Sequence, residues 1–165
     1  MTNVHGTTIL LGRAGDILGA PPDTGILLLG ESGAGKSDLA LRLIESGAVL
    51  VADDRTELFV RDERLMGKAP AGLEGLLEVR GVGILELPRA NEARVDLAVL
   101  LAIGADTLRL PQTHHYDAPA SVGVPHDARP PLLHLAPFEA SAPAKVIAAA
   151  AAHAKALFRD QRKAV

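Results

Sequence analysis

The chain of 165 residues contains no cysteine, which excludes disulfide bonds, thiolate-ligated metals and cysteine nucleophiles and is compatible with a reducing compartment. It also has no tryptophan, one tyrosine and three phenylalanines, so few side chains could stack on the bases of single-stranded nucleic acid. Lys and Arg total 17 against 20 Asp and Glu, which argues against a basic binding face. We therefore expect no nucleic-acid partner.

Long apolar segments are absent as well. No stretch approaches the about 18 consecutive apolar residues of a membrane-spanning helix. The first residues, Met1–Leu11, lack the basic region and long apolar run of a secretion signal. We therefore expect a cytoplasmic protein with no membrane contact. A mass of 17.2 kDa suits a single globular domain over residues 1–165.

Short apolar runs separated by glycine and proline dominate the first half of the chain. Runs of this kind predict strands, here at Thr7–Leu11, Asp16–Leu18, Gly25–Leu29 and Ala48–Ala52. After a glycine-rich loop, leucine and isoleucine recur at helical spacing, which predicts a helix over Ser37–Ser46. Strand, glycine loop, helix and strand in this order form a βαβ unit, so we expect an α/β fold.

The second half is less regular. Glu57–Arg61 and Arg64–Gly67 predict a hairpin, and Val95–Leu101 predicts a further strand. The segment Pro111–Pro131 contains five prolines and no periodicity, which predicts an irregular excursion. A proline in the first turn and a high alanine content then predict a closing helix over Ala142–Arg162.

The glycine-rich loop matches the phosphate-binding pattern G-x-x-x-x-G-K-[ST]. Its residues are Gly30, Glu31, Ser32, Gly33, Ala34, Gly35, Lys36 and Ser37. The glycines let backbone N–H groups point into one concavity, Lys36 supplies a charge for the β- and γ-phosphates, and the Ser37 hydroxyl can ligate Mg²⁺. Because an apolar strand precedes the loop and a helix follows it, we expect nucleotide binding.

Two aspartates, Asp53 and Asp54, follow the apolar strand Ala48–Ala52. A Mg²⁺-dependent phosphoryl transfer needs an acidic residue, commonly at the end of a neighbouring strand. Adjacent side chains there point in opposite directions, so one carboxylate can face the γ-phosphate and the other the metal or a second partner. The structural alternative is a turn-forming aspartate pair.

Two common classes of phosphate-loop protein fit poorly. A Ras-type GTPase carries an N-K-x-D guanine box, but Asn3 and Asn91 are the only asparagines and neither begins one. A nucleoside or adenylate kinase normally has an arginine-rich lid, whereas the candidate segment Pro111–Pro131 contains only Arg129. Both interpretations are therefore disfavoured.

A third motif, Leu77–Ile84, reads L-E-V-R-G-V-G-I. Together with the phosphate loop, the acidic strand end and His5-Gly6 before the first strand, it resembles the catalytic C-terminal domain of the HPr kinase/phosphorylase family, whose signature is close to L-E-[IV]-R-G-[ILV]-G-[IV]. The resemblance implies a phosphate-loop core with a mixed β-sheet, similar to phosphoenolpyruvate carboxykinase. It is carried by residues 30–84 and weakens after residue 100.

The resemblance implies catalytic roles for the matching residues. Asp53 matches the acid/base aspartate that accepts the proton of the attacking serine, and Lys36 would stabilise the transferring phosphoryl group. His5 matches a histidine near the phosphates, and Arg80 belongs to the signature segment that shapes the active site. Arg109 matches an active-site arginine, which would stabilise transition-state charge.

The resemblance also implies the cofactors and the reaction. ATP would be the phosphoryl donor, Ser37 and Glu78 would hold Mg²⁺, and Asp54 would support that metal shell. The implied activity is that of a serine kinase acting on the phosphocarrier protein HPr, or on an HPr-like carrier, in regulation of the phosphotransferase system. By the same resemblance we expect a homo-oligomer.

Two departures from the family pattern limit what carries over. The chain starts almost at the catalytic domain, so we expect a short form without the N-terminal domain of longer members. The P-V-x-P-G-R-N segment linked to dephosphorylation is also missing, with Val122–Pro125 and Pro131–Leu133 in its approximate place. We therefore expect the phosphorylase activity to be reduced or absent.

Two other functions stay open at this stage. One is a small-molecule kinase of carboxykinase-like type, and the other is a catalytically silent module that senses nucleotides. The presence of Lys36, Ser37, Asp53 and Glu78 together argues against the silent module, because a site without catalysis does not need every chemical part.

Overall fold

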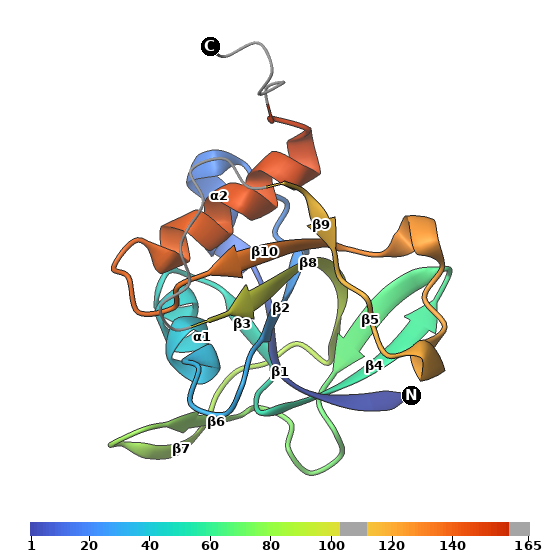
Figure 1. Ribbon diagram of the computed structural model, residues 1–165. Helices are drawn as coiled ribbons and strands as arrows, with labels where there is room; N and C mark the ends of the chain where they lie inside the picture. The colour runs from blue at the N-terminus through green and yellow to red at the C-terminus, as the bar shows by residue number, and fades with distance from the viewer. Residues whose placement is uncertain (103–111, 159–165) are drawn as a thin grey trace.

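The computed structural model describes residues 1–102 and 112–158, in which an eight-stranded mixed sheet, a small two-stranded sheet and two α-helices form (Figure 1). The strands are β1 (Thr2–Leu10), β2 (Gly25–Leu29), β3 (Val49–Ala52), β4 (Arg55–Arg61), β5 (Arg64–Lys68), β6 (Leu76–Val79), β7 (Gly83–Glu86), β8 (Glu92–Leu101), β9 (His114–His115) and β10 (Pro131–Leu135). The α-helices are α1 (Lys36–Glu45) and α2 (Ala142–Lys155), and short 3-10 helices cover Gly12–Leu18, Ala120–Val122 and His126–Ala128.

The large sheet runs in the order β2-β1-β4-β5-β8-β10-β9, and β3 pairs with β1. β1 is antiparallel to both β2 and β3, so β3 runs parallel to β2 with β1 between them. The predicted strand-helix-strand unit, in which α1 connects β2 to β3, is therefore confirmed. β2 also pairs in parallel with β8, so β1, β2, β4, β5 and β8 form a closed circuit in which each strand has a neighbour on both sides.

The two helices pack beside each other and share one core cluster with the strands. Leu39 and Leu43 of α1 are fully buried there. α2 contributes Val146 and Ala150, spaced four residues apart so that they lie on the same helix face. Three of the four buried residues of α2 are alanines, so its core-facing side consists mostly of small side chains.

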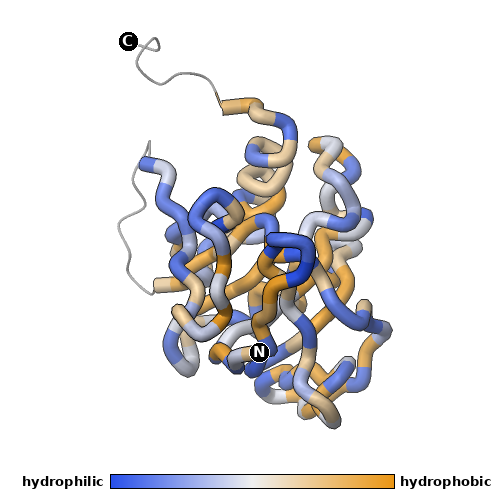
Figure 2. The backbone as a smooth tube through the Cα atoms, turned by 90° about the vertical axis from the view of Figure 1, so that its right-hand side faces the viewer, coloured by the Kyte–Doolittle hydropathy of each residue, from blue (hydrophilic) through white to orange (hydrophobic). Residues whose placement is uncertain are grey.

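The central strand β2 is buried on both faces. Ile26 and Leu28 point into the helix-side cluster, whereas Leu27 belongs to a second cluster with Leu58 and Leu65 on the other side of the sheet. Figure 2 shows the hydrophobic residues gathered along the strands in the interior of the molecule. A continuous apolar run is what such a doubly covered strand requires, and it holds the phosphate loop on a rigid support.

The hairpin β6–β7 forms a sheet of its own and extends away from the large sheet (Figure 1). Leu77 anchors it in the interior with no exposed surface. At its far end Val82 and Ile84 are about 70% exposed, at 72% and 70%. The signature segment therefore has a buried base and an exposed tip.

The strand predicted at Asp16–Leu18 is wrong. These residues lie in the 3-10 helix Gly12–Leu18, which ends at Gly19 in the left-handed conformation. Ile17 is 98% exposed, so the short apolar run has no sheet face to cover. A run of so few residues cannot by itself distinguish a strand from a helical turn.

The other predicted elements are present with shifted ends, whereas the strands β6, β7, β9 and β10 were not predicted from the sequence. The hairpin predicted over Glu57–Arg61 and Arg64–Gly67 is confirmed as β4 and β5. The closing helix ends at Lys155 rather than Arg162, because Ala156 adopts the left-handed conformation and its N–H bonds back to Ala152; residues 159–162 lie outside the described part. Neither described α-helix is long and apolar enough to cross a membrane.

Candidate active site

The phosphate loop connects the end of β2 to the first turn of α1. Gly30 has φ +148°, and a Cβ there would lie 2.8 Å from the carbonyl oxygen of Leu101 and 2.9 Å from the Cβ of Ala34. Only glycine fits this turn, which redirects the chain from the strand into the loop. Because the loop ends at the N-terminus of α1, unpaired N–H groups and the positive end of the helix dipole face the concavity.

Lys36 is buried, and its ammonium donates to the carbonyl oxygens of Gly30 and Glu31, each 2.9 Å away. Its third contact is with Nε2 of His5 at 2.8 Å. An ammonium has no acceptor, so Nε2 of His5 must accept and Nδ1 must carry the ring proton. Nδ1 then donates to the backbone carbonyl oxygen of Asp54 at 3.0 Å. The His5 ring thus links the phosphate loop to the acidic end of β3.

Charge and burial act in opposite directions on Lys36. Burial lowers the pKa of its ammonium, whereas the carboxylates of Asp54 and Asp53 raise it. A polyphosphate at the loop would add further negative charge and favour the ammonium form. Burial is the larger effect, so the pKa of Lys36 is lowered overall, and bound phosphates would raise it again.

Asp53 lies at the buried side of the site, with 7% of its surface exposed. One carboxylate oxygen, Oδ1, accepts from the hydroxyls of Thr7 at 2.7 Å and Ser37 at 2.8 Å. The other, Oδ2, accepts from the backbone N–H of Glu78 at 3.2 Å. Asp53 therefore joins β1, the phosphate loop and the signature hairpin through a carboxylate whose two oxygens are both engaged.

Asp54 differs from its neighbour in backbone conformation and exposure. Its φ of +62° places it in the left-handed region, which aspartate tolerates better than most residues. This turn directs the side chain outward, where 64% of it is exposed and Oδ1 lies 3.3 Å from Nδ1 of His5. The predicted divergence of the two carboxylates is present, with Asp53 inside the protein and Asp54 on the open side.

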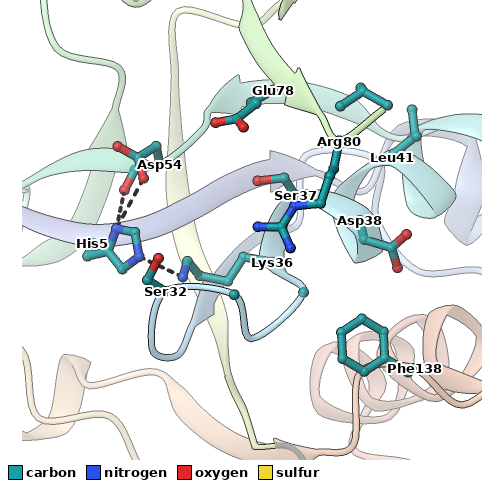
Figure 3. A pocket seen from close by; sticks show the side chains of 13 residues that line it. His5, Ser32, Lys36, Ser37, Asp38, Leu41, Asp54, Glu78, Arg80 and Phe138 are labelled. Atoms are coloured by element: carbon teal, nitrogen blue, oxygen red, sulfur yellow. Dashed lines mark hydrogen bonds and ion pairs between the residues drawn. The ribbon is translucent and has the colours of Figure 1, made fainter. Parts of the chain in front are cut away.

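These groups border an open pocket of about 290 Å³ (Figure 3). Its lining residues are His5, Ser32, Gly33, Gly35, Lys36, Ser37, Asp38, Leu41, Asp54, Glu78, Val79, Arg80 and Phe138. In Figure 3, His5 and Asp54 lie at one end and Phe138 at the other, with the phosphate loop between them. A shallow groove shares His5 and Asp54 with the pocket and continues past Asn3 and Arg55.

The donor set near Ser37 fits Mg²⁺. The Ser37 hydroxyl, the Asp53 carboxylate bonded to it and the Glu78 side chain in the lining are all oxygen ligands, which Mg²⁺ prefers. Within residues 1–102 and 112–158 no three His, Asp or Glu side chains are grouped to enclose a metal. Mg²⁺ in phosphoryl-transfer sites commonly takes one or two protein ligands and completes its shell with phosphate and water.

Most predicted site residues come together at this pocket. Arg80 reaches its rim from the signature hairpin, beside Glu78 and Val79. Glu31 contributes its backbone carbonyl to Lys36, whereas its side chain is exposed and is not part of the lining. Arg109 lies outside the described residues.

Four residues at the site were not predicted from the sequence, namely Thr7, Asp38, Leu41 and Phe138. Thr7 reaches Asp53 from β1, and Phe138 reaches the phosphate loop from the segment after β10. A threonine inside a strand carries no distinguishing sequence signal. Phe138 is one of only four aromatic residues, and this scarcity is the signal that could have drawn attention to it.

Fold and site together define an α/β protein of the phosphate-loop class. The family model described as the HPr Serine kinase C-terminal domain matches residues 4–95, more than half of the chain. The chain therefore belongs to this family. The match covers the phosphate loop, both aspartates and the signature hairpin.

Individual proteins support the assignment. Over 112 residues the chain is 39% identical to the HPr kinase/phosphorylase of Levilactobacillus brevis, an alignment that covers 63% of this chain and 33% of the relative. With the HPr kinase/phosphorylase of Limosilactobacillus reuteri it is 50% identical over 64 residues, or 38% of this chain and 20% of the relative. The chain thus matches about a third or less of the length of these relatives.

A solved structure agrees in fold. The HPr(Ser) kinase/phosphatase of Coxiella burnetii superposes with a TM-score of 0.69 over 90% of this chain and 93% of that one, at 21% identity. The predicted α/β class, with a mixed sheet around a carboxykinase-like phosphate-loop core, is therefore confirmed.

Proposed function

We propose that this protein transfers the γ-phosphoryl group of ATP, with Mg²⁺, to a serine of HPr or of an HPr-like carrier. The observation that carries the proposal is the contact chain from Lys36 through His5 to Asp54, which sets a phosphate-binding cation beside an accessible carboxylate. The names of the relatives support HPr as the acceptor. The groove past His5 and Asp54 offers room for a protein segment at that end of the pocket.

In the proposed reaction the backbone N–H groups of Gly33–Ser37 and the Lys36 ammonium hold the phosphates in line with the acceptor. Ser37 and Glu78 would hold Mg²⁺, which would offset charge on the phosphates. The serine oxygen forms a bond to the γ-phosphorus, and the bond to the bridging oxygen breaks to release ADP. Positioning and electrostatic stabilisation supply most of the rate in such transfers.

The general base is best assigned to Asp54 rather than to Asp53, the residue favoured by the sequence. Asp53 is buried, and both its oxygens already accept hydrogen bonds. Asp54 lines the pocket and the groove and has an exposed carboxylate, so it can accept the proton of a serine hydroxyl from an incoming protein. We assign Asp53 the task of orienting Ser37 and the hairpin.

The test is the intact mass of an HPr-like carrier after incubation with the protein, ATP and Mg²⁺. One added phosphoryl group on a serine is the expected result, and Lys36→Ala should abolish it. If the carrier stayed unmodified and ATP was consumed only in the presence of a small metabolite, the protein would be assigned as a small-molecule kinase instead. If the protein bound ATP but never consumed it, a nucleotide-sensing module would be the better assignment.

The remaining expectations belong to the same proposal. We expect little pyrophosphate release when phosphoserine-carrier is supplied with inorganic phosphate and Mg²⁺, because the P-V-x-P-G-R-N segment is missing. Release as fast as the forward reaction would contradict this. A cytoplasmic location and a homo-oligomer also stay predictions, and a sedimentation measurement tests the second.

A further inference from the structure

Phe138 is the aromatic residue of the pocket. It follows β10 in the segment that leads to α2, and 58% of its surface is exposed. The other three aromatic residues, Phe59, Tyr116 and Phe158, are not in the pocket lining. A large apolar side chain that is this exposed beside a polar phosphate loop is a candidate contact surface for a ligand.

Contacts with α1 fix the backbone on both sides of Phe138. Arg42 of α1 donates to the backbone carbonyl oxygens of Pro137 and Glu139, the two neighbours of Phe138. Asp38 holds the same guanidinium through an ion pair at 2.9 Å. The segment that carries the ring is thereby tied to the helix that begins at the phosphate loop.

The ring itself lies against the loop. A Cβ on Gly35 would lie 2.9 Å from Cε1 of Phe138 and would displace the exposed ring, while the φ of +87° independently favours glycine there. One edge of the ring is thus in contact with the phosphate loop, while more than half of the side chain faces outward. Leu41, one turn beyond Asp38 on α1, adds apolar surface to the same lining.

The two ends of the pocket differ in chemistry. His5, Asp54 and Lys36 make one end polar and charged, whereas Phe138 and Leu41 supply apolar surface at the other, where Asp38 also lies (Figure 3). Transfer to a serine at Asp54 requires the γ-phosphate at the polar end. The nucleoside of the same ligand then extends from the loop toward Phe138.

We propose that Phe138 is the stacking platform for the nucleobase of the phosphoryl donor. The inference rests on the proposed function, since it takes a nucleoside triphosphate as the ligand of the phosphate loop. Stacking uses the π-face that every base has, so the platform adds affinity without strong base selectivity. ATP and GTP should therefore bind with similar affinity.

Calorimetry with ATP and with inorganic tripolyphosphate, both in the presence of Mg²⁺, separates the base from the phosphates. Phe138→Ala should raise the Kd for ATP about tenfold, as expected for loss of a base-stacking aromatic ring, and leave the Kd for tripolyphosphate unchanged. Phe158→Ala is the matched control, because Phe158 is 57% exposed and lies outside the pocket lining. It should change neither Kd.

A second variant reads the stacking directly. The chain has no tryptophan, so Phe138→Trp introduces a single tryptophan, whose emission can be excited selectively, at the platform. ATP should quench its emission and tripolyphosphate should not. If Phe138→Ala raised the Kd for ATP and for tripolyphosphate equally, or if bound ATP did not quench the tryptophan, the stacking role of Phe138 would be wrong. The proposed function would not be affected by either result. If the unaltered protein bound neither ligand, nucleotide binding itself and the proposed function would be overturned.

Discussion

The two walls of the pocket differ in burial, and the pair Asp53 and Asp54 marks the boundary between them. On the inner wall, Lys36 is buried and bonded to the phosphate loop, and Asp53 is buried directly behind the lining, where it is bonded to Ser37. On the outer wall, Asp54 and Arg80 are exposed. Neighbouring residues of the same type therefore lie in different surroundings, and in the proposed function the inner one holds the geometry and the outer one meets the substrate.

The largest effect that follows from this contrast is expected for Asp54→Asn. Loss of the proposed general base should lower the turnover of phosphoryl transfer by about a hundredfold to ten-thousandfold. The Kd for ATP and the free energy of unfolding should stay close to those of the unaltered protein, because the side chain is exposed. Carrier phosphorylation followed by mass spectrometry measures the turnover.

Nearly full turnover of Asp54→Asn would show that the base lies elsewhere. If Asp53→Asn instead abolished transfer with unchanged stability, the assignment made from the sequence would be the correct one.

The second effect concerns the inner wall. Asp53→Asn replaces a carboxylate that accepts from Thr7, Ser37 and Glu78 by an amide that cannot accept on both sides. We expect the free energy of unfolding to fall by about 2 kcal/mol, as is typical for hydrogen bonds to a charged group. Urea denaturation measures it, with Asp54→Asn as the control, for which a change within about 0.5 kcal/mol is expected at an exposed site. An equal loss of unfolding free energy in Asp53→Asn and Asp54→Asn would show that the two walls do not differ in their contribution to stability.

A third effect is a dependence of stability on pH. The pKa of Lys36 is lowered from 10.5, chiefly by burial, so the unfolded chain binds more protons than the folded protein as the pH approaches 10.5. Stability from this group therefore increases as the pH rises from the lowered pKa toward 10.5. Lys36→Met removes the titrating group and should flatten that part of the profile.

Urea denaturation between neutral pH and pH 10.5 tests this for the two proteins in parallel. If the free energy of unfolding changed with pH by the same amount in both proteins, groups other than Lys36 would cause the pH dependence.

The smallest effect is expected at the tip of the signature hairpin. Replacing the exposed Val82 by serine should change the free energy of unfolding by no more than about 0.5 kcal/mol. Leu77→Ala, in the buried base of the same hairpin, should cost about 2 to 5 kcal/mol. Thermal or urea denaturation of both variants compares them, and a large loss from Val82→Ser would mean that the tip contributes to the fold.

Much of the fold was predictable because its strongest signals are local. Apolar runs bounded by glycine and proline located β2, β3, β8 and the β4–β5 hairpin to within a few residues. The error at Asp16–Leu18 arose where the run was too short for its periodicity to be decided. The β6–β7 pairing was not predictable in the same way, because its strands are only four residues each and too short to show a clear periodicity.

For the site, the sequence alone determined the phosphate loop. Glycines that permit φ values of +148° and +87°, a lysine and a serine at fixed spacing are local chemistry, readable from eight consecutive residues. The same holds for the presence of two carboxylates after β3. Which of them is buried is a different question, since both are aspartates with the same intrinsic chemistry.

Only the tertiary structure decided that question. Pairing of β1 with β2, β3 and β4 brings Thr7 to Asp53 across 46 residues and His5 to Lys36 across 31. Likewise, the hydrogen bonds of Arg42 to the residues on either side of Phe138 hold this ring against the phosphate loop, about a hundred residues earlier in the chain. Such contacts depend on strand pairing and helix packing over long separations, which local sequence patterns do not encode.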